Sequence, residues 1–404
     1  MARSNILMLI NNSNGWISFD KFMYVALYGK GCGYYNKPLS ENSFGPFGAK
    51  GDFITAPMMG PWLAKTLAKN FIDLTNQAPN YLKNKLNIRE IGAGTGDLAA
   101  DILIDLNNYR CLPKTYEIIE INKNMTRLQK KVILNKLENK SPDLSKFIFS
   151  KIKWRSNFID EKNYFDCENY SKISGMVIAN ELLDSFPTKI FKFVPSRIGG
   201  LSSVLEYGVS IDKDQVFLCT EKIASAELHD AVAQRFGESV QRGYPWNSEK
   251  FGEWCPYIPK WCNQVMNKID WGQLYIIDYG KERYELDYPT RVESTLTTYR
   301  NHNQFTDLDQ CIKNPGHQDI TAQVDFTAIV DELSKLDRIT LEIKTQAAWM
   351  LDSGVLELAE KMFFLENKKL SPRDYNLLGS LQNQLSDATM GQSFLVLSAK
   401  KFSN

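Results

Sequence analysis

A glycine-rich turn between an apolar segment and a helical pattern constrains this chain more than any other feature. Residues 88–91 are typical of a buried strand, glycines follow at 92, 94 and 96, and residues 98–104 have helical spacing. Glycine has no Cβ, so it suits a sharp turn with positive φ and lets the backbone approach a ligand closely. A strand, a glycine turn and a helix start together predict a nucleotide-type site at the carboxyl edge of a sheet.

The spacing of the glycines excludes two phosphate-binding motifs. A dinucleotide fingerprint GxGxxG would need glycine at Asp97, and the Gly-Lys-Ser/Thr ending of a P-loop is absent. The remaining pattern, with Glu90 in the acidic place before Gly92, Gly94 and Gly96, resembles the first motif of class I S-adenosylmethionine (SAM) methyltransferases. There the glycines make room for the amino-acid end of the ligand, and the acid can hold its ammonium. An ordinary structural turn is the alternative.

A second acid lies at the end of the next predicted strand. The apolar run 116–120 ends in Glu120, and a carboxylate at a strand tip can accept both ribose hydroxyls of a nucleoside, as in dinucleotide folds. Alone, Glu120 would be an ordinary strand-end charge, but beside the glycine loop the sequence favours ribose binding. Residues 147–154 predict another strand, followed by Asn157 and Phe158, which could hold an adenine by its amino group and one face.

Composition sets outer limits on the function. The 404 residues include 43% hydrophobic and 24% charged residues, which is typical of a globular protein, and the length allows one large domain with insertions or two domains. A net charge of +1 disfavours nucleic acid and anionic membranes as partners. Seven cysteines without a Cys-x-x-Cys and three histidines predict no metal site. No apolar run approaches the roughly 18 residues of a membrane span, and the start resembles no signal or transit peptide, so we expect a cytoplasmic protein.

The order of patterns predicts an α/β core with two additions. Residues 1–84 precede the first strand of the motif and are expected to form a helical and loop cap over the active site; an ordered surface loop is the alternative. Residues 85–187 and 271–404 carry the parallel strand pattern of the core. Residues 188–270 contain short strand-like pieces and many aromatic residues. They predict an inserted α+β subdomain whose aromatic residues pack its core or line a substrate cleft.

Six motifs in a fixed order resemble those of the MidA family of SAM-dependent methyltransferases. They are GDFITAP at 51–57, EIGAGTG at 90–96, ANELLDSFP at 179–187, IDYG at 277–280, QDITAQVDF at 318–326 and TQAA at 345–348. The resemblance runs from about residue 20 to the C-terminus. It implies a class I, Rossmann-like fold with a seven-stranded, mostly parallel sheet, and SAM as cofactor.

The family also suggests a substrate. It includes the mitochondrial assembly factor that methylates an arginine on a core subunit of respiratory complex I. The resemblance therefore implies a protein arginine N-methyltransferase acting on a respiratory-complex-type subunit, and it is compatible with a homodimer. The 51–57 motif adds Asp52 and Thr55 to the cofactor-binding candidates. Family members usually have an acid after this motif, whereas this chain has Met58.

Arginine chemistry suggests which residues would act. A guanidinium stays protonated below pH of about 12, so the enzyme must align it with the methyl group and exclude water. Carboxylates can orient it through bidentate hydrogen bonds. Glu181, with Asp184 one helical turn later, is the predicted catalytic pair, and Asn180 is a candidate orienting amide. For Asp184, an ordinary charge at a helix start is the alternative.

Other methyltransferase chemistries are less compatible with the sequence. Amino-methyltransferases that act on adenine or glutamine commonly carry Asn/Asp-Pro-Pro-Tyr, and no Pro-Pro occurs here. No cysteine lies in a motif suited to 5-methylcytosine chemistry. Two alternatives stay open: a small-molecule methyltransferase, and a non-catalytic assembly factor with a degenerate SAM pocket. Met58 favours the second, and the intact glycine loop with Glu120 disfavours it.

Overall fold

The computed structural model describes residues 1–38, 46–48, 51–52, 55–156, 167–195, 203–291, 293–300, 303–363 and 369–402. The chain forms two compact units, which are described separately. Unit 1 comprises Met1–Pro38, Leu183–Lys260 and Lys281–Ile329, and unit 2 comprises Leu39–Leu182, Trp261–Gly280 and Val330–Asn404. The boundaries of these units differ from the division predicted at residues 84, 187 and 270, which stays a prediction.

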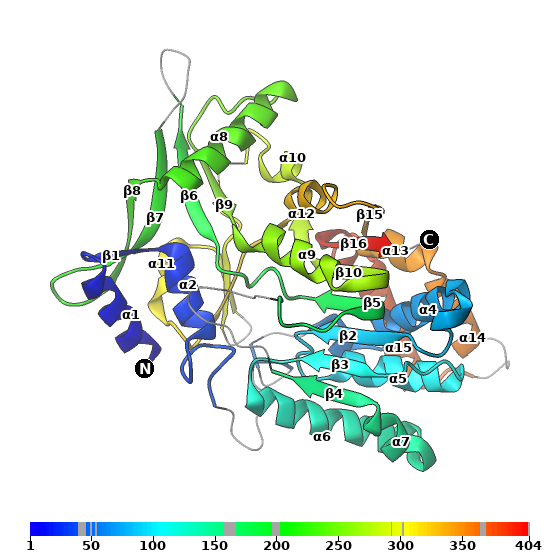
Figure 1. Ribbon diagram of the computed structural model, residues 1–404. Coiled ribbons are helices and arrows are strands. Elements are labelled where there is room, and N and C mark those ends of the chain that lie inside the picture. The colour runs from blue at the N-terminus through cyan, green and yellow to red at the C-terminus, as the bar shows by residue number, and fades with distance from the viewer. Residues whose placement is uncertain are drawn as a thin grey trace. The chain divides into compact units, whose positions relative to one another are not determined.

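Unit 2 contains the sheet that the glycine motif predicted. Along its main path the strand order is β15-β16-β10-β5-β2-β3-β4 (Figure 1). The strands are β2 (Asn87–Ile91), β3 (Tyr116–Ile119), β4 (Ile152–Arg155), β5 (Ile173–Asn180), β10 (Ile269–Lys281), β15 (Ile339–Thr345) and β16 (Phe394–Lys401). Strands β4, β3, β2, β5 and β10 pair in parallel, whereas β16 is antiparallel to both β10 and β15. The sheet is therefore mixed, and its parallel part carries the glycine motif.

Helices of unit 2 complete an α/β fold around one apolar core. They are α3 (Ala56–Met59), α4 (Trp62–Gln77), α5 (Asp97–Asn108), α6 (Lys123–Lys140), α7 (Ser145–Ser150), α13 (Gln346–Asp352), α14 (Val355–Phe363), α15 (Pro372–Leu385) and α16 (Met390–Ser393), with short 3-10 helices η1 (Asn80–Leu82) and η2 (Pro142–Leu144). Residues of α4 and α5 pack with the apolar residues of β2, β3 and β5 in the core. This packing holds the carboxyl ends of the parallel strands in a fixed order, which is what a ligand site at the sheet edge requires.

One predicted strand is wrong in its first half. Residues 145–150 form helix α7, and the strand begins only at Ile152. Phenylalanine and isoleucine favour strands, but here Ile148 is buried and Phe149 packs on Trp154 with ring centroids 5.6 Å apart. Tertiary packing on one side of a short helix therefore overrides the local preference.

Unit 1 is built on an antiparallel sheet of order β1-β7-β6-β9, with β8 paired to β7, and a smaller sheet β12-β11-β13. Its strands are β1 (Trp16–Ser18), β6 (Lys189–Val194), β7 (Ser203–Ile211), β8 (Phe217–Ile223), β9 (Lys250–Trp254), β11 (Thr297–Arg300), β12 (Asn303–Phe305), β13 (Asp319–Thr321) and β14 (Val324–Asp325). Its helices are α1 (Ala2–Asn12), α2 (Phe19–Tyr28), α8 (Ala226–Gln241), α10 (Arg283–Leu286) and α11 (Leu308–Lys313). Helices α9 (Tyr257–Asn267) and α12 (Phe326–Leu333) each contain a boundary between the units.

Several aromatic residues of the predicted insert form a core. The ring of Phe193 lies 4.8 Å from that of Phe236 and 5.0 Å from that of Trp246, measured between centroids. Trp246 is buried, and its indole N–H donates to the main-chain oxygen of Asp287. For these residues, packing inside unit 1 explains the aromatic content better than a cleft does.

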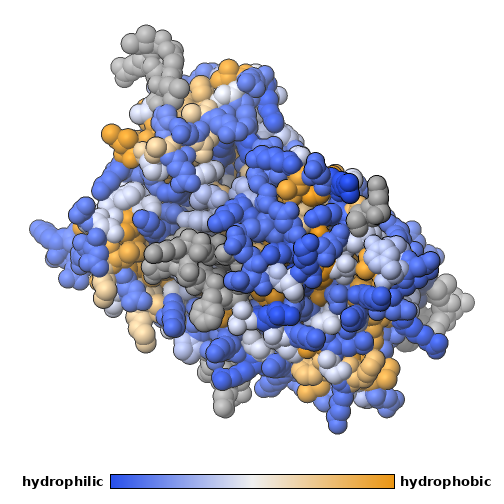
Figure 2. Space-filling model, viewed as in Figure 1, coloured by the Kyte–Doolittle hydropathy of each residue, from blue (hydrophilic) through white to orange (hydrophobic). Residues whose placement is uncertain are grey.

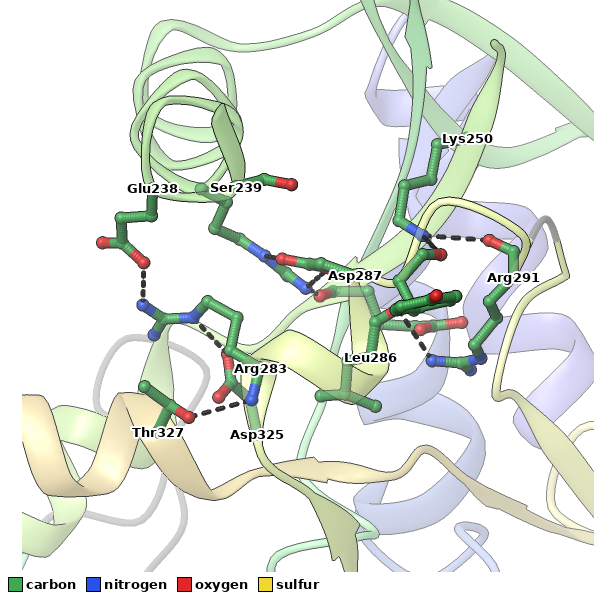
Figure 3. Close-up of polar contacts among 12 residues, drawn as sticks. Glu238, Ser239, Lys250, Arg283, Leu286, Asp287, Arg291, Asp325 and Thr327 are labelled. Carbon is green, nitrogen blue, oxygen red and sulfur yellow. Dashed lines mark hydrogen bonds and ion pairs between the residues drawn. The ribbon is translucent and has the colours of Figure 1, made fainter. Parts of the chain in front are cut away.

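Buried and half-buried charges in unit 1 form a network of ion pairs (Figure 3). Arg235 donates to both carboxylate oxygens of Asp287, at 3.1 and 2.5 Å, and both residues are buried. Arg283 contacts Glu238 at 2.7 Å and Asp325 at 3.0 Å. Each carboxylate in this network has a guanidinium partner, which is the usual condition for burying a charge.

Apolar residues are concentrated in these interiors rather than on the visible surface. On the face shown in Figure 2 the described residues are mostly hydrophilic, and hydrophobic ones are scattered in small groups. Among the helices that the structure describes, none is long and apolar enough to cross a membrane.

Candidate functional site

The glycine turn adopts the conformation that the sequence predicted. Gly92, Gly94 and Gly96 have φ angles of +74°, +50° and +90°, and Gly96 is the N-cap of α5. A Cβ on Gly92 would lie 2.9 Å from Leu182, so packing as well as φ requires glycine there. A Cβ on Gly94 would have only the Phe47 ring, at 3.9 Å, among described atoms within 4 Å. Gly94 is therefore the position where a ligand could approach the backbone.

A buried glutamine joins this turn to the predicted ribose acid. Gln129 of α6 donates its Nε2 to the main-chain oxygen of Gly94 at 2.9 Å and to Glu120 Oε2 at 2.7 Å. Its Oε1 accepts from the indole of Trp154 at 3.1 Å. Gln129 is not among the site residues that the sequence predicts. The available signal was a polar side chain in the buried row of positions 125, 129, 133 and 137 on an otherwise lysine-rich helix.

Glu120 follows β3 directly and is buried. Besides Gln129, it accepts a hydrogen bond from the Asn122 N–H at 2.8 Å. Burial raises its pKa to about 7, opposed by hydrogen bonds from Asn122, Gln129 and Ile121. Within the described part of the chain no cation pairs with this carboxyl. Burying the ionised form of this carboxyl costs free energy, and a ligand that donates hydrogen bonds to it would offset that cost.

Glu90, in β2, is likewise buried, and its carboxyl accepts a hydrogen bond from the Tyr116 hydroxyl at 2.7 Å. Burial raises the pKa of Glu90 to about 7, and the Tyr116 hydrogen bond opposes the rise. The described residues provide no ion pair for it. Two acids without a described cation thus lie on β2 and directly after its parallel neighbour β3.

Glu181 lies just after β5 in a left-handed conformation, with φ of +48°. Its N–H donates to the Ile277 oxygen at 2.9 Å, and its Oε1 accepts from Asn180 Nδ2 at 3.2 Å. Although the residue is partly exposed, burial of the carboxyl raises its pKa to about 8; Asp278 adds to the rise, and hydrogen bonds from Asn180 and the Ala56 main chain oppose it. A non-glycine residue with positive φ is an unfavourable conformation that is often kept at functional sites.

Asp278 was missed as a site residue, although the IDYG motif that contains it was noted. It is fully buried in β10 and accepts from the main-chain N–H groups of Leu182, at 3.1 Å, and Tyr279, at 2.8 Å. Because its charge raises the pKa of Glu181, the two carboxyls act on each other electrostatically. Two acids near one position favour a cation between or beside them.

The 51–57 motif reaches this acid pair. Thr55 is the N-cap of α3, and the next residue, Ala56, donates its main-chain N–H to Glu181. Earlier in the motif, the Asp52 N–H donates to the Pro46 oxygen at 2.8 Å, so these two residues lie side by side. Met58 lies close to Gly48: a Cβ added to Gly48 would lie 3.0 Å from the Met58 Cε.

Three predicted residues are not brought to this site by the described structure. Asn157 and Phe158 lie outside the described residues. Asp184 belongs to unit 1, where its main-chain oxygen accepts from the Ala322 N–H at 2.9 Å. Its pairing with Glu181, a residue of unit 2, stays a prediction. No group of His, Cys, Asp and Glu side chains that could hold a metal ion occurs among the described residues.

Parallel strands with a left-handed glycine turn, and acids at or near the ends of neighbouring strands, are typical of nucleoside-binding α/β enzymes. A comparison with protein families narrows this class. Residues 62–342 match a family described as "Putative S-adenosyl-L-methionine-dependent methyltransferase". The match covers more than half of the chain, so the chain belongs to this family of SAM-dependent methyltransferases. The resemblance to the MidA family is thereby confirmed.

Relatives and solved structures agree with this assignment. A protein arginine methyltransferase NDUFAF7 homolog of Caenorhabditis elegans is 26% identical over 325 residues, covering 78% of this chain and 67% of the relative. The NDUFAF7 protein arginine methyltransferase of Xenopus tropicalis is 24% identical over 331 residues, covering 80% and 69%. A Burkholderia thailandensis structure bound to S-adenosyl-homocysteine has a TM-score of 0.79 at 24% identity, covering 99% of this chain and 92% of that one. The structural likeness shows that the methyltransferase fold is shared.

The residues of the site fit the family's cofactor. SAM carries a sulfonium and an ammonium, both cationic, and a ribose with two hydroxyl donors. The glycine turn is open to a ligand at Gly94, and Glu90 and Glu120 are buried acids without a described cation. Such a set suits a cationic nucleoside and not a polyphosphate.

Proposed function

We propose that this methyltransferase transfers the methyl group of SAM to an arginine side chain of a protein. In this proposal Gly92, Gly94 and Gly96 cradle the amino-acid end of SAM and Glu120 accepts its ribose hydroxyls. Glu90 supports the ammonium end. The remaining cofactor contacts come from Asp52 and Thr55 of the 51–57 motif and from Asn157 and Phe158. Both curated relatives reported above bear the name of protein arginine methyltransferases, which supports arginine as the acceptor.

The observation that carries the proposal is the environment of Glu181. Its carboxyl is surrounded by Asp278, Asn180 and the Ala56 N–H, and no cation among the described residues neutralises it. Asn180 adds a buried Oδ1 that accepts no hydrogen bond from the described residues. A guanidinium offers five donors and no acceptor, so it complements carboxylate and amide oxygens together.

Glu181 also supplies a proton acceptor for the reaction. The N–C bond to the methyl forms as the S–C bond of the sulfonium breaks. The guanidinium must then lose one proton, because the methylated product keeps a single positive charge. A carboxyl whose pKa is about 8, raised by burial and by Asp278, can take that proton near neutral pH better than an ordinary glutamate. Asn180 orients the acceptor, and Asp184 is the second predicted acid.

Several finer points belong to the same proposal. The sheet is the seven-stranded, mostly parallel sheet of class I methyltransferases, and part of the N-terminal cap covers the cofactor; the Phe47 ring beside Gly94 supports the cap. The 188–270 insert binds substrate. The target is a subunit of a respiratory-complex type, the enzyme acts in the cytoplasm, and a homodimer is compatible with these roles.

The direct test uses tritiated SAM and a cell lysate, followed by mass spectrometry of the labelled product. We expect label on arginine of a protein. Label on lysine, on glutamine or on a small metabolite would reject the arginine proposal, and the last outcome would favour a small-molecule methyltransferase. If calorimetry detects SAM binding but the unmodified protein labels no acceptor, a non-catalytic assembly factor is favoured instead.

A further inference from the structure

One face of helix α15 holds the segment that carries Ala56. The indole N–H of Trp62 donates to the Leu377 oxygen at 2.8 Å and contacts Ser380 Oγ at 3.1 Å. Further along, Gln384 Nε2 donates to the main-chain oxygen of Ala56 at 3.5 Å. Positions 377, 380 and 384 are spaced by three and four residues and therefore share one helix face. Both ends of the segment between Ala56 and Trp62 are thus attached to the same helix.

Helix α13 in turn holds the end of α15. Gln346, its first residue, donates Nε2 to the main-chain oxygen of Gln384 at 3.2 Å. Carbonyls in the last turn of a helix have no partner within the helix, so this bond satisfies one of them. Thr345 caps α13 by accepting from the Ala348 N–H at 3.3 Å. The TQAA motif at 345–348, which the proposed chemistry does not use, therefore fixes the position of Gln384.

Packing alone does not explain why both residues are glutamines. Gln346 and Gln384 are fully buried, and the Oε1 atom of each accepts no hydrogen bond from the described residues. A buried amide oxygen without a donor is unfavourable. Leucine would fill a similar volume without that cost, so the donated Nε2 bonds are the feature that distinguishes glutamine here.

We propose that Gln384, held by Gln346, is a positioning residue that keeps the Ala56 N–H directed at the Glu181 carboxyl. The inference rests on the proposed function, in which Glu181 binds the guanidinium and accepts its proton. Gln384 fixes the carbonyl of Ala56, and the N–H of the same residue donates to Glu181. The groups that act on this carboxyl are the charge of Asp278 on β10, the amide of Asn180 on β5 and the Ala56 N–H. Of these, the Ala56 bond depends on α15.

The test is the pKa of Glu181, measured by NMR on protein with 13C-labelled glutamate carboxyls. Loss of the signal in Glu181→Gln assigns it. In Gln384→Leu the Ala56 N–H is less firmly held, so ionised Glu181 loses stabilisation and its pKa rises. A complete loss of one bond to a charged group corresponds to roughly one to two pKa units, so we expect a rise of at least about half a unit. SAM affinity should be unchanged.

The matched control is Gln382→Leu, the same substitution at an exposed position of the same helix. This variant should leave the pKa of Glu181 unchanged. Gln346→Leu, one contact further away, should raise the pKa less than Gln384→Leu and tests the inference if that variant does not fold. An unchanged pKa in folded Gln384→Leu, or an equal rise in Gln382→Leu, would overturn it.

The titration separates this inference from the function on which it rests. It needs no methyl acceptor, so it reports on the Ala56–Glu181 contact whatever the substrate is. If Glu181→Gln methylates as fast as the parent, the proposed role of Glu181 fails, while the pKa rise in Gln384→Leu is still measured. Where both hold, the acid limb of the pH–rate profile should move upward in Gln384→Leu together with the pKa of Glu181.

Discussion

Buried and half-buried carboxyl groups are stabilised in different ways in two regions of the molecule. In unit 1, the Nε and Nη2 atoms of Arg235 donate to the carboxylate of Asp287 (Figure 3). Arg283 contacts the carboxylates of Glu238 and Asp325. The charge of Asp287 raises the pKa of Arg235 despite burial, which lowers it. In this network each carboxylate has a guanidinium partner that the protein itself supplies.

At the edge of the unit 2 sheet, the acids have hydrogen-bond donors but no described cation. Glu90, Glu120 and Glu181 have pKa values raised to about 7, 7 and 8, in each case mainly by burial. The lack of a cationic partner is a property of these three acids and not of all acids in unit 2. On β2, the neighbouring Arg89 is ion-paired with Glu117 of β3, so the same two strands carry a balanced pair and an unbalanced acid.

The difference indicates what each set of acids is for. A balanced pair stabilises or specifies a fold and needs nothing from outside. An unbalanced buried acid costs free energy in the free protein, and that cost is recovered when a cation binds. The acids of the sheet edge thus have the properties expected of a site for the cationic cofactor and, in our proposal, for a guanidinium.

The largest effect is expected from breaking the balanced pair. Asp287→Asn removes the charge opposite Arg235 and leaves a buried guanidinium without its carboxylate. Loss of one partner of a buried pair costs up to about 3–5 kcal/mol. We expect a loss of that order in the free energy of unfolding, measured by urea titration, with SAM affinity unchanged in the folded protein. Unchanged stability would show that the pair contributes nothing.

The next effect concerns the loop between the unbalanced acids. Gly94→Val places a β-branched residue at φ of +50° where a ligand is expected to approach. We expect SAM binding to weaken by at least about a hundredfold, or roughly 2.8 kcal/mol, as measured by calorimetry. Circular dichroism checks that the variant is folded. Parent-like affinity in the folded variant would remove the assignment of this loop to the cofactor.

Glu181→Gln tests the acid assigned to the substrate. The amide keeps the shape but carries no charge and cannot take a proton. A hydrogen bond to a charged group is worth roughly 1.5–3 kcal/mol, which corresponds to about tenfold to a hundredfold in rate. We expect turnover to fall at least that much while SAM affinity is retained. Glu285→Gln, which neutralises an acid that pairs with Lys281 in unit 1 and lies outside residues 188–270, is the control and should leave turnover unchanged.

These regions also differ in how far the sequence could predict them. The glycine turn and Glu120 were predictable because a strand, a positive-φ turn and a strand-end acid are local patterns with fixed spacing. Confirmation of the family rests on motifs of the same local kind. Local patterns failed at residues 147–150, where packing made a helix out of strand-forming residues.

Contacts between segments far apart in the chain could not be predicted from the sequence. Gln384 meets Ala56 across 328 positions, and Gln129 joins Gly94 to Glu120 from a different helix. No spacing rule connects such residues, because tertiary packing alone brings them together. The sequence likewise does not show that Arg235 and Asp287 are buried and paired, because exposed charged residues have the same composition.

The smallest effect has the opposite sign from the first. Glu120→Gln should stabilise the ligand-free protein at pH 8 by about 1–3 kcal/mol, because it removes a buried charge while keeping an acceptor for the Asn122 and Gln129 donors. In the parent, the pKa of Glu120 is about 7 in the folded state and ordinary, near 4.3, in the unfolded chain. The folded protein therefore binds more protons than the unfolded chain in this window. The contribution of Glu120 to stability is present below pH of about 4.3 and is lost as the pH rises through about 7.

Urea titrations at pH 5 and pH 8 measure this sign directly. The gain of Glu120→Gln over the parent should be small at pH 5 and larger at pH 8, and SAM should bind the variant more weakly because an amide oxygen is a poorer acceptor for the ribose. Asp287→Asn is the matched comparison, since it neutralises a balanced acid and should destabilise at both pH values. If Glu120→Gln destabilised the ligand-free protein at pH 8 as Asp287→Asn does, Glu120 would be a structural acid like Asp287, and the distinction between balanced and unbalanced carboxyls would fail at this position.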